Sequence, residues 1–283
     1  MNSNPLRLQP FPYQGSKRVL APVIFKYVKR DYQSIIEPFA GSSAVVVYAA
    51  YNKLGDKFWI NDNYEPLILL WKRIVDDPEG LAAEYEHLWL AQQDDPVGFY
   101  YQIRAAFNAS PSSETLLFLL AKCAKNAVRF NSHGEFNQSP DKRRLGRRPN
   151  EMRKQLLTTS MLLKDKTKIS SRDYNQVFDE ATSKDLVYLD PPYQGTSNGS
   201  NPRYSMGLSR EKLIESLESL RRRNVPFILS YDGSLGDKSY GDPLPASLGL
   251  HHKQVVVGRS AQATLNGRVE HTTESIYLSP ELL

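Results

Sequence analysis

The motif best suited to chemistry is Asp190-Pro191-Pro192-Tyr193, which follows an apolar run at 185–189. The exocyclic amine of adenine is a poor nucleophile because its lone pair is delocalised into the ring. The carboxylate of Asp190 and the backbone carbonyl of Pro191 can each accept one of its N–H bonds, which keeps electron density on the nitrogen. The prolines fix the direction of that carbonyl, and Tyr193 can stack on a base that has left a helix. The alternative is a Pro-Pro turn with an incidental aspartate.

A second group of polar residues follows earlier apolar runs. The segment Glu37-Pro38-Phe39-Ala40-Gly41 joins a short strand to a helix rich in small residues. A glycine in such a turn lets the backbone approach a ligand closely, and Glu37 can face a sulfonium or an amine. Asp62 ends the next strand, where a carboxylate can take both hydroxyls of a ribose or cap the following helix. The turn lacks the G-x-G-x-x-G pattern of a nicotinamide site.

These residues need a parallel sheet to bring strand ends together. Short apolar runs predict strands that alternate with helices, and two late runs, 255–257 and 275–278, predict an antiparallel pair. The expected strands are 35–36, 58–62, 185–190 and 226–230, and the expected helices are 67–90, 116–128 and 210–223. The core positions expected on the first helix are Leu69, Leu70, Ile74, Leu81, Leu88 and Trp89.

Residues 129–154 differ in character and are called the basic segment here. They hold few aliphatic residues and carry Arg129, Lys142, Arg143, Arg144, Arg147, Arg148, Arg153 and Lys154. The pattern predicts an exposed insert with a flexible loop at 142–144 that makes mostly phosphate contacts. Arg129 is expected nearer the bases or the folded part of the insert. A merely solvated surface is the alternative.

Composition limits the classes of protein to which the chain can belong. The 283 residues include 36 basic and 31 acidic side chains, for a formal charge of +5, which suits a polyanion but is shared by many enzymes without one. The single cysteine, Cys123, excludes a disulfide framework and a cysteine-rich zinc site, and we expect no metal. Without a signal-like N-terminus or a long apolar stretch, we expect a cytoplasmic protein with no membrane partner, monomeric or weakly dimeric.

Together these segments resemble the Dam-type (alpha-group) adenine-N6 DNA methyltransferases, in which the cofactor motif precedes the recognition insert and the catalytic motif follows it. The resemblance covers most of the chain. The matching segments are 11–18 with Tyr13 and Lys17, 37–41, Asp62, 129–137, Asp173-Tyr174, 190–193, Arg259-Ser260, Arg268 and Glu274.

The resemblance implies an α/β, S-adenosylmethionine-dependent (Rossmann-like) mixed sheet with an inserted, mainly helical target-recognition domain. The catalytic domain would span 1–93 and 171–283, and the insert 94–170. The implied cofactor, S-adenosylmethionine, would be held by Tyr13, Lys17, Glu37, Pro38, Phe39, Gly41, Asp62, Asp173, Tyr174 and Asp190. The implied catalytic residues are Asp190, Pro191, Pro192 and Tyr193. The expected partner, double-stranded DNA, would contact Arg129, Asn131, Lys142, Arg143, Arg144 and Tyr204. A restriction endonuclease that acts on the same site is a further partner the family suggests.

Two departures bear on the geometry. Ser43 stands where the family has a second glycine, so we expect the turn to avoid a strongly positive φ there, and Gly207-Leu208 replaces the usual Gly-Phe.

A C5-cytosine enzyme would need a cysteine after a proline, whereas Cys123 follows Lys122. An N4-cytosine enzyme stays open, although Asp190 favours adenine. RNA or protein methylation, a non-catalytic DNA-binding protein and an oxidoreductase are less well supported.

Overall fold

The protein is built around one mixed β-sheet. The computed structural model describes residues 8–192, 208–235, 238–240, 244–259 and 271–283. Within these ranges eight strands form one sheet in the order β3-β2-β1-β4-β5-β8-β7, with β6 paired to β5. The first five strands of this order are parallel, whereas β8 and β7 run antiparallel to their neighbours. The strands are β1 (Ser34–Glu37), β2 (Lys57–Asn61), β3 (Thr167–Ser170), β4 (Asp185–Leu189), β5 (Phe227–Leu235), β6 (Lys238–Tyr240), β7 (His251–Arg259) and β8 (His271–Leu278).

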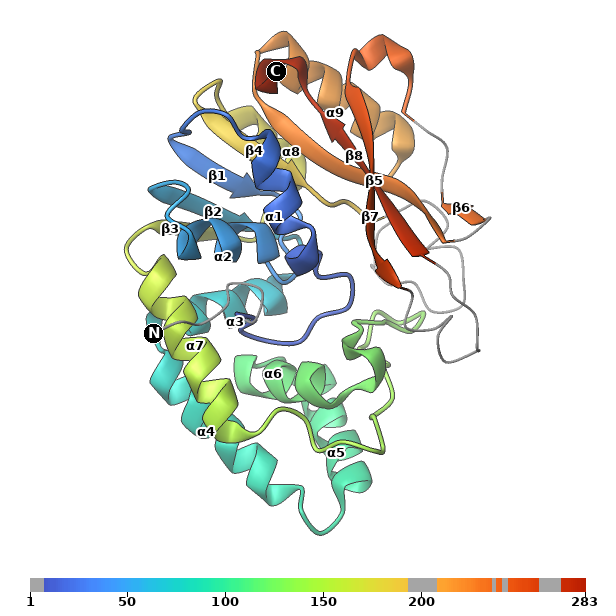
Figure 1. Ribbon diagram of the computed structural model, residues 1–283. Helices are drawn as coiled ribbons and strands as arrows, with labels where there is room; N and C mark the ends of the chain where they lie inside the picture. Colours follow the sequence, from blue (N-terminus) through green and yellow to red (C-terminus); the bar gives the residue numbers. More distant parts are fainter. Residues whose placement is uncertain (1–7, 193–207, 236–237, 241–243, 260–270) are drawn as a thin grey trace.

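Helices cover both faces of the sheet, with α1 and α2 on one side and α8 and α9 on the other (Figure 1). Alternation along the strands produces the two cores. In β1, Ile35 packs with the α1 and α2 side, and its neighbour Ile36 packs with the α8 and α9 side. The described helices are α1 (Ala21–Ile24), α2 (Ala44–Tyr51), α3 (Glu65–Asp76), α4 (Pro78–Ala91), α5 (Pro96–Ala109), α6 (Ser113–Lys122), α7 (Pro149–Leu163), α8 (Tyr174–Glu180) and α9 (Arg210–Arg222).

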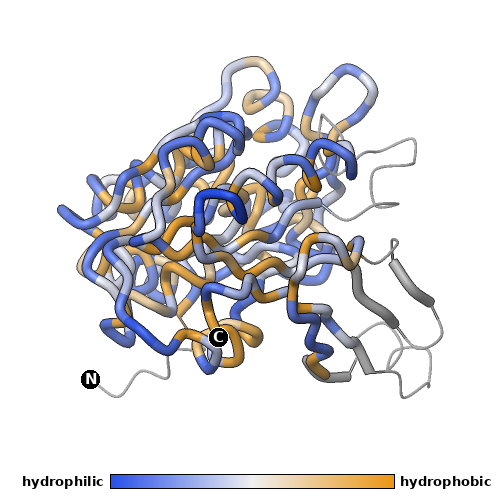
Figure 2. Tube along the Cα trace, turned by 90° about the horizontal axis from the view of Figure 1, so that it is seen from above, coloured by the Kyte–Doolittle hydropathy of each residue, from blue (hydrophilic) through white to orange (hydrophobic). Residues whose placement is uncertain are grey.

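Hydropathy along the chain matches this layering. Hydrophobic segments concentrate along the strands and the inner sides of the helices, and hydrophilic segments lie at the outer helices and turns (Figure 2). Within the described ranges, no helix is both long enough and apolar enough to cross a bilayer.

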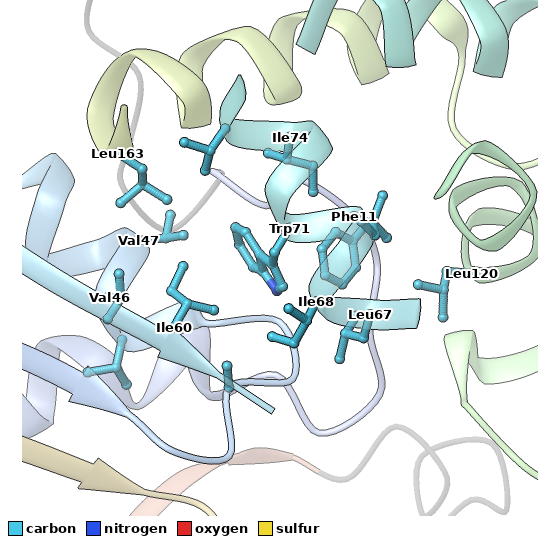
Figure 3. Packing of buried hydrophobic residues seen from close by; sticks show 14 of the residues in the cluster. Phe11, Val46, Val47, Ile60, Leu67, Ile68, Trp71, Ile74, Leu120 and Leu163 are labelled. Atoms are coloured by element: carbon cyan, nitrogen blue, oxygen red, sulfur yellow. The ribbon is translucent and has the colours of Figure 1, made fainter. Parts of the chain in front are cut away.

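Helices α3 to α7 form a separate helical unit that continues the core on the α2 side of the sheet. Trp71 on α3 is fully buried, meets the ring of Phe11 edge-on at 5.4 Å, and lies among the aliphatic residues labelled in Figure 3. Its indole Nε1 donates a hydrogen bond of 3.0 Å to the carbonyl of Gly41. The helical unit is therefore attached directly beneath the glycine turn that follows β1.

The helix expected over 67–90 is in fact two helices, which corrects the sequence interpretation. Pro78 has no N–H to continue α3, and the carboxylate of Asp77 accepts a 3.1 Å hydrogen bond from the Gly80 amide, which caps α4. Leu69 is 42 % exposed, so its assignment to the core was wrong. Leu70 and Ile74 are fully buried as expected.

The expected domain boundaries also differ from the observed elements. Strand β3 pairs with β2 although residues 167–170 were expected in the insert. Helices α3 and α4 pack against α6 and α7, so the helical unit begins well before residue 94. The helix expected to reach Val128 ends at Lys122, where Cys123 turns to an extended conformation. The late antiparallel pair is confirmed, because Val255 lies opposite Glu274 in the β7–β8 ladder.

Candidate active site

A cavity of about 350 Å³ opens at the carboxyl ends of β1 and β4. These neighbouring parallel strands mark the point where the chain order reverses, because β2 and β3 lie on one side of β1 and β4 on the other. Crevices of this kind are where open α/β sheets bind ligands. The motif residues that line the cavity are Tyr13, Lys17, Glu37, Phe39, Gly41, Asp62, Asp173, Tyr174, Asp190, Pro191 and Pro192. Pro38 is not brought there, because it is buried with its carbonyl bonded to Asn61. The assignment of Tyr193 lies outside the described residues.

Three charged side chains meet on one side of this cavity. The ammonium of Lys17, from the short turn η2 (Lys17–Val19), lies 3.2 Å from Oδ1 of Asp190 and 3.5 Å from Oε2 of Glu274. Burial acts to lower the pKa of Lys17, but the two carboxylates outweigh it, so the pKa lies above its usual value. Burial raises the pKa of Asp190 to about 6; Lys17 acts to lower it and Glu274 to raise it. Asp190 is therefore mostly ionised at neutral pH, although its pKa of about 6 lies close to neutrality.

Glu37, the acid at the end of β1, accepts hydrogen bonds from the turn and the helix that follow the strand. Glu37 is buried, accepts a hydrogen bond from the Ser43 hydroxyl, and accepts the amides of Val45 at 3.3 Å and Val46 at 3.1 Å. A carboxylate at this place stabilises the first turn of α2 through its free N–H groups. Burial nevertheless raises the pKa of Glu37 to about 7. The carboxyl group of Glu37 therefore lies in the cavity wall with its oxygens already engaged by the turn.

The turn corrects the expectation for Ser43. Its φ is +44°, in the left-handed region that serine rarely adopts, although we expected the turn to avoid a strongly positive φ there. The bond from its hydroxyl to Glu37 and the 2.6 Å bond from its amide to the Ala40 carbonyl hold this conformation. The chain thus adopts a positive φ at this position without a glycine.

Asp62 is fixed at the end of β2. Its Oδ2 accepts the Gly41 amide at 3.0 Å, and its Oδ1 accepts the Tyr64 amide at 3.0 Å. Burial raises the pKa of Asp62. Gly41 has a φ of +47°, and a Cβ at this position would lie 3.2 Å from the ring of Tyr13, so the turn has no room for a side chain. The arrangement leaves a rigid carboxylate and bare backbone facing the cavity.

An aromatic wall faces these acids. The rings of Phe39 and Tyr174 pack at 5.1 Å, and Asp173 begins α8 by accepting the Asn175 amide at 2.9 Å. The Tyr174 hydroxyl is buried and has no hydrogen-bond partner in the described part of the chain. An unpaired buried hydroxyl, flat rings and several carboxylates fit a ligand that carries a purine, a ribose and a positive charge.

All the expected DNA-contacting residues except Tyr204 lie in the region between α6 and α7. Phe130 and Phe136 pair across a short hairpin. The side chain of Asn131 accepts the amides of His133 and Glu135, each at 3.0 Å, and so shapes the hairpin turn. Arg129 is half-buried at the base of the hairpin. Contact between DNA and Arg129 or Asn131 stays a prediction, and for Asn131 the structure shows a role in the turn itself.

The loop after the hairpin displays basic side chains around one buried acid. Asp141 accepts Nε of Arg144 at 2.8 Å and the backbone amide of Arg143 at 3.0 Å. Lys142, Arg143 and Arg144 are exposed. The buried carboxylate holds this loop in a defined shape, which differs from the flexible loop that we expected.

The rest of the basic segment is only partly an exposed insert, which corrects the sequence interpretation: Arg148 and Lys154 are exposed, but Arg147 and Arg153 contact other parts of the chain. Arg147 is half-buried and donates to the carbonyl of Gln9 at 2.6 Å. Arg153 lies on α7 and pairs with Glu79 and Glu86 of α4. These arginines are used inside the helical unit because the chain returns there to the sheet.

Some assignments fall outside the described residues, and one role was missed. Tyr204, Ser260 and Arg268 are not described. Glu274 was noted only as part of a hairpin, yet it binds Lys17 at the cavity. Its sequence signal was weak, since one acid in the run His-Thr-Thr-Glu-Ser resembles any exposed strand residue until β8 is placed beside β5.

Comparisons with known proteins agree with the geometry. The model of the family described as D12 class N6 adenine-specific DNA methyltransferase matches residues 13–258. Type II methyltransferase M.MjaIII of Methanocaldococcus jannaschii is 29 % identical over 185 residues, which cover 60 % of this chain and 62 % of that protein. DNA N-6-adenine-methyltransferase of Escherichia phage P1 is 24 % identical over 235 residues, which cover 79 % of this chain and 30 % of the phage protein. DNA adenine methylase of Haemophilus influenzae is 24 % identical over 277 residues, which cover 94 % and 92 % of the two chains. The chain thus spans less than two thirds of the first two relatives and most of the third.

Proposed function

The chain belongs to the D12 class of N6 adenine-specific DNA methyltransferases, and on this premise we propose that it transfers a methyl group from S-adenosylmethionine to N6 of adenine in duplex DNA. The observation that carries the proposal is the position of Asp190. Its carboxylate follows β4, lines the cavity at the switch point of the sheet, and is oriented through one oxygen by Lys17. No donor from the described part of the chain occupies its other oxygen.

The residues of the chain act on the amine rather than on the methyl group. Asp190 accepts one N–H of the target amine, and the Pro191 carbonyl accepts the other, so the nitrogen lone pair is turned toward the methyl donor. Pro191 and Pro192 stiffen this segment. S-adenosylmethionine supplies a methyl group already activated by the positive sulfur. Catalysis then depends on orientation and on charge placement in a site that excludes water.

The residues that line the cavity support the following proposed positions for the parts of that cofactor. Asp62 would take the ribose hydroxyls, as strand-end acids do in related sheets. The rings of Phe39 and Tyr174 would hold the adenine, with Asp173 beside its amine. Glu37 and Asp190 would offset the positive sulfur, since both carboxylates line the same cavity. Tyr13, packed on Gly41, would close the side near η2.

DNA would lie across the hairpin at 129–137 and the loop that displays Lys142, Arg143 and Arg144. The target base would leave the helix to reach Asp190, and stacking of Tyr193 on it stays a prediction because that residue is outside the described part. A cognate restriction endonuclease, and a monomeric or weakly dimeric state, likewise stay predictions.

Product analysis tests this function. The protein is incubated with methyl-labelled S-adenosylmethionine and duplex DNA of mixed sequence, and the digested nucleosides are separated by mass. The proposal expects label in N6-methyldeoxyadenosine. Label in N4- or 5-methyldeoxycytidine would reassign the substrate, and label only in RNA or protein would reject DNA as the acceptor.

A further inference from the structure

Glu274 is a charged group that the proposed mechanism does not use, and it contacts Lys17 in the wall of the cavity. It lies in β8, between β5 and β7, with Gly233 opposite on one side and Val255 on the other. The β5–β8 register shifts between Ser230 and Gly233, next to this position. Such irregularities redirect side chains near active sites. A backbone held on both sides by neighbouring strands makes Glu274 a fixed point for whatever its side chain binds.

The contact of Glu274 with Lys17 determines how Lys17 meets Asp190. The ammonium lies 3.2 Å from Asp190 and 3.5 Å from Glu274, and both distances exceed the 2.7–2.9 Å of a close charged hydrogen bond. The three side chains are only 10 %, 24 % and 17 % exposed for Lys17, Asp190 and Glu274, so solvent screens them weakly. One cation is therefore shared between two carboxylates instead of closing on one.

We propose that Glu274 is a positioning residue for methyl transfer, which shares the Lys17 ammonium so that Asp190 keeps a basic carboxylate oxygen for the target amine. The inference rests on the proposed function. With Glu274 neutral, Lys17 closes on Asp190, withdraws electron density from it and draws it away from the amine. In this role Glu274 acts through its contact with Lys17.

The charged and titratable groups around this cluster define the pH behaviour. Among the residues that the structure describes, they include Lys17 from η2, Glu274 from β8, Glu37 from β1 and Tyr188 from β4. Glu274 raises the pKa of Asp190, and Lys17 lowers it. Loss of the Glu274 charge and a tighter Lys17 contact both lower the pKa of Asp190, whereas release of Lys17 from Asp190 would raise it. In a variant without the Glu274 charge, a fall in the pKa of Asp190 therefore indicates that Glu274 shares the Lys17 ammonium. A rise in that pKa indicates that Glu274 only anchors Lys17.

The test compares pH profiles of single-turnover methyl transfer at saturating cofactor and DNA. Glu274→Gln should move the acid limb down by about one pH unit and lower the plateau rate by about tenfold. Glu274→Asp, which keeps the charge, should restore most of both. The matched control is Glu281→Gln, because Glu281 pairs with Arg221 in the same C-terminal region, outside the cavity. Its profile should match wild type.

An acid limb that moves up or stays in place in Glu274→Gln overturns the inference, as does a plateau equal to that of the control. A second readout does not depend on activity. Titration of the carboxyl carbon of Asp190 by NMR, assigned with Asp190→Asn, should give a lower midpoint in Glu274→Gln than in wild type. If wild type methylates no adenine, the proposed function fails, and this titration alone decides the inference.

Discussion

The carboxyl edge of the sheet and the basic segment both concentrate charge, but they hold it in different ways. At the edge, the Lys17 and Asp190 side chains are 10 % and 24 % exposed and contact each other. In the basic segment, Arg143 and Arg144 are 87 % and 61 % exposed, although both reach the same buried acid, Asp141. The first region has its charges fixed before any ligand arrives, and the second presents them to solvent.

This difference separates chemistry from attachment. A charge held in a poorly screened cavity changes the protonation of its neighbours, and its removal leaves a buried partner unpaired. An exposed arginine contributes little to the fold and acts on a polyanion chiefly through counterion release. Variants at the edge should therefore change rates and cofactor binding, while variants in the basic segment should change DNA affinity and its salt dependence.

The largest expected effect is that of pH on the rate of methyl transfer at the carboxyl edge of the sheet. Ionised Asp190 accepts the N–H bond much more strongly than the protonated acid does, and burial raises the pKa of Asp190 to about 6. Wild-type kcat/KM should therefore be level above this pH and fall about tenfold for each pH unit below it. DNA affinity measured at the same pH values should not follow that limb. A rate that is independent of pH between 5 and 7 would show that ionisation of Asp190 does not control the reaction.

The next effect concerns the cofactor. Asp62→Asn removes the charge that would bind the ribose while keeping an acceptor for the Gly41 amide. Affinity for S-adenosylmethionine should fall roughly tenfold to a hundredfold, the loss of a charged hydrogen bond of about 1.5–3 kcal/mol. Lys17→Met should weaken binding much less, because its ammonium faces Asp190 and Glu274. Calorimetry without DNA measures both, and equal losses would mean that Lys17 binds the cofactor directly.

Smaller changes are expected in the basic segment. Arg143→Ala and Arg144→Ala should each reduce the slope of log affinity against log salt by roughly one unit. The matched control is Arg153→Ala, since Arg153 is paired with Glu79 and Glu86 inside the helical unit. All three should keep the wild-type rate at saturating DNA. If Arg153→Ala lowered the slope and the loop variants did not, the DNA-binding surface would lie elsewhere.

The smallest effect should appear in stability. Ser43→Ala removes the bond to Glu37 while leaving a positive φ, so the free energy of unfolding should fall by about 1–2 kcal/mol. Ser43→Gly loses the same bond but relaxes the backbone, and should be less harmful. Urea unfolding distinguishes them, and a glycine variant less stable than the alanine variant would show that φ is not strained.

The sequence predicted the edge in outline because strand ends are easy to recognise. The apolar runs before Glu37, Asp62 and Asp190 placed all three at one end of a parallel sheet. The partners of these acids were harder to predict. Glu37 bonds to helix amides eight and nine residues along the chain. Glu274 reaches Lys17 only after β8 joins β5, a pairing that no local pattern specifies.

The basic segment was predicted less well because charge does not reveal burial. Arg147 and Arg153 look like surface residues by type, but their partners, Gln9 and Glu79, are distant in sequence. Asp77-Pro78 is a recognisable helix start in the sequence. The apolar periodicity continues on both sides of it, however, so the sequence interpretation joined the two helices.

The most direct test of the central claim, that Asp190 holds the target amine, is the single-turnover rate of Asp190→Asn at saturating cofactor and DNA. The amide offers one acceptor without charge, so the rate should fall by at least about tenfold, the effect of losing about 1.5 kcal/mol of hydrogen bonding. Cofactor and DNA binding should remain measurable. A rate equal to that of wild type, with N6-methyladenine still formed, would contradict the account.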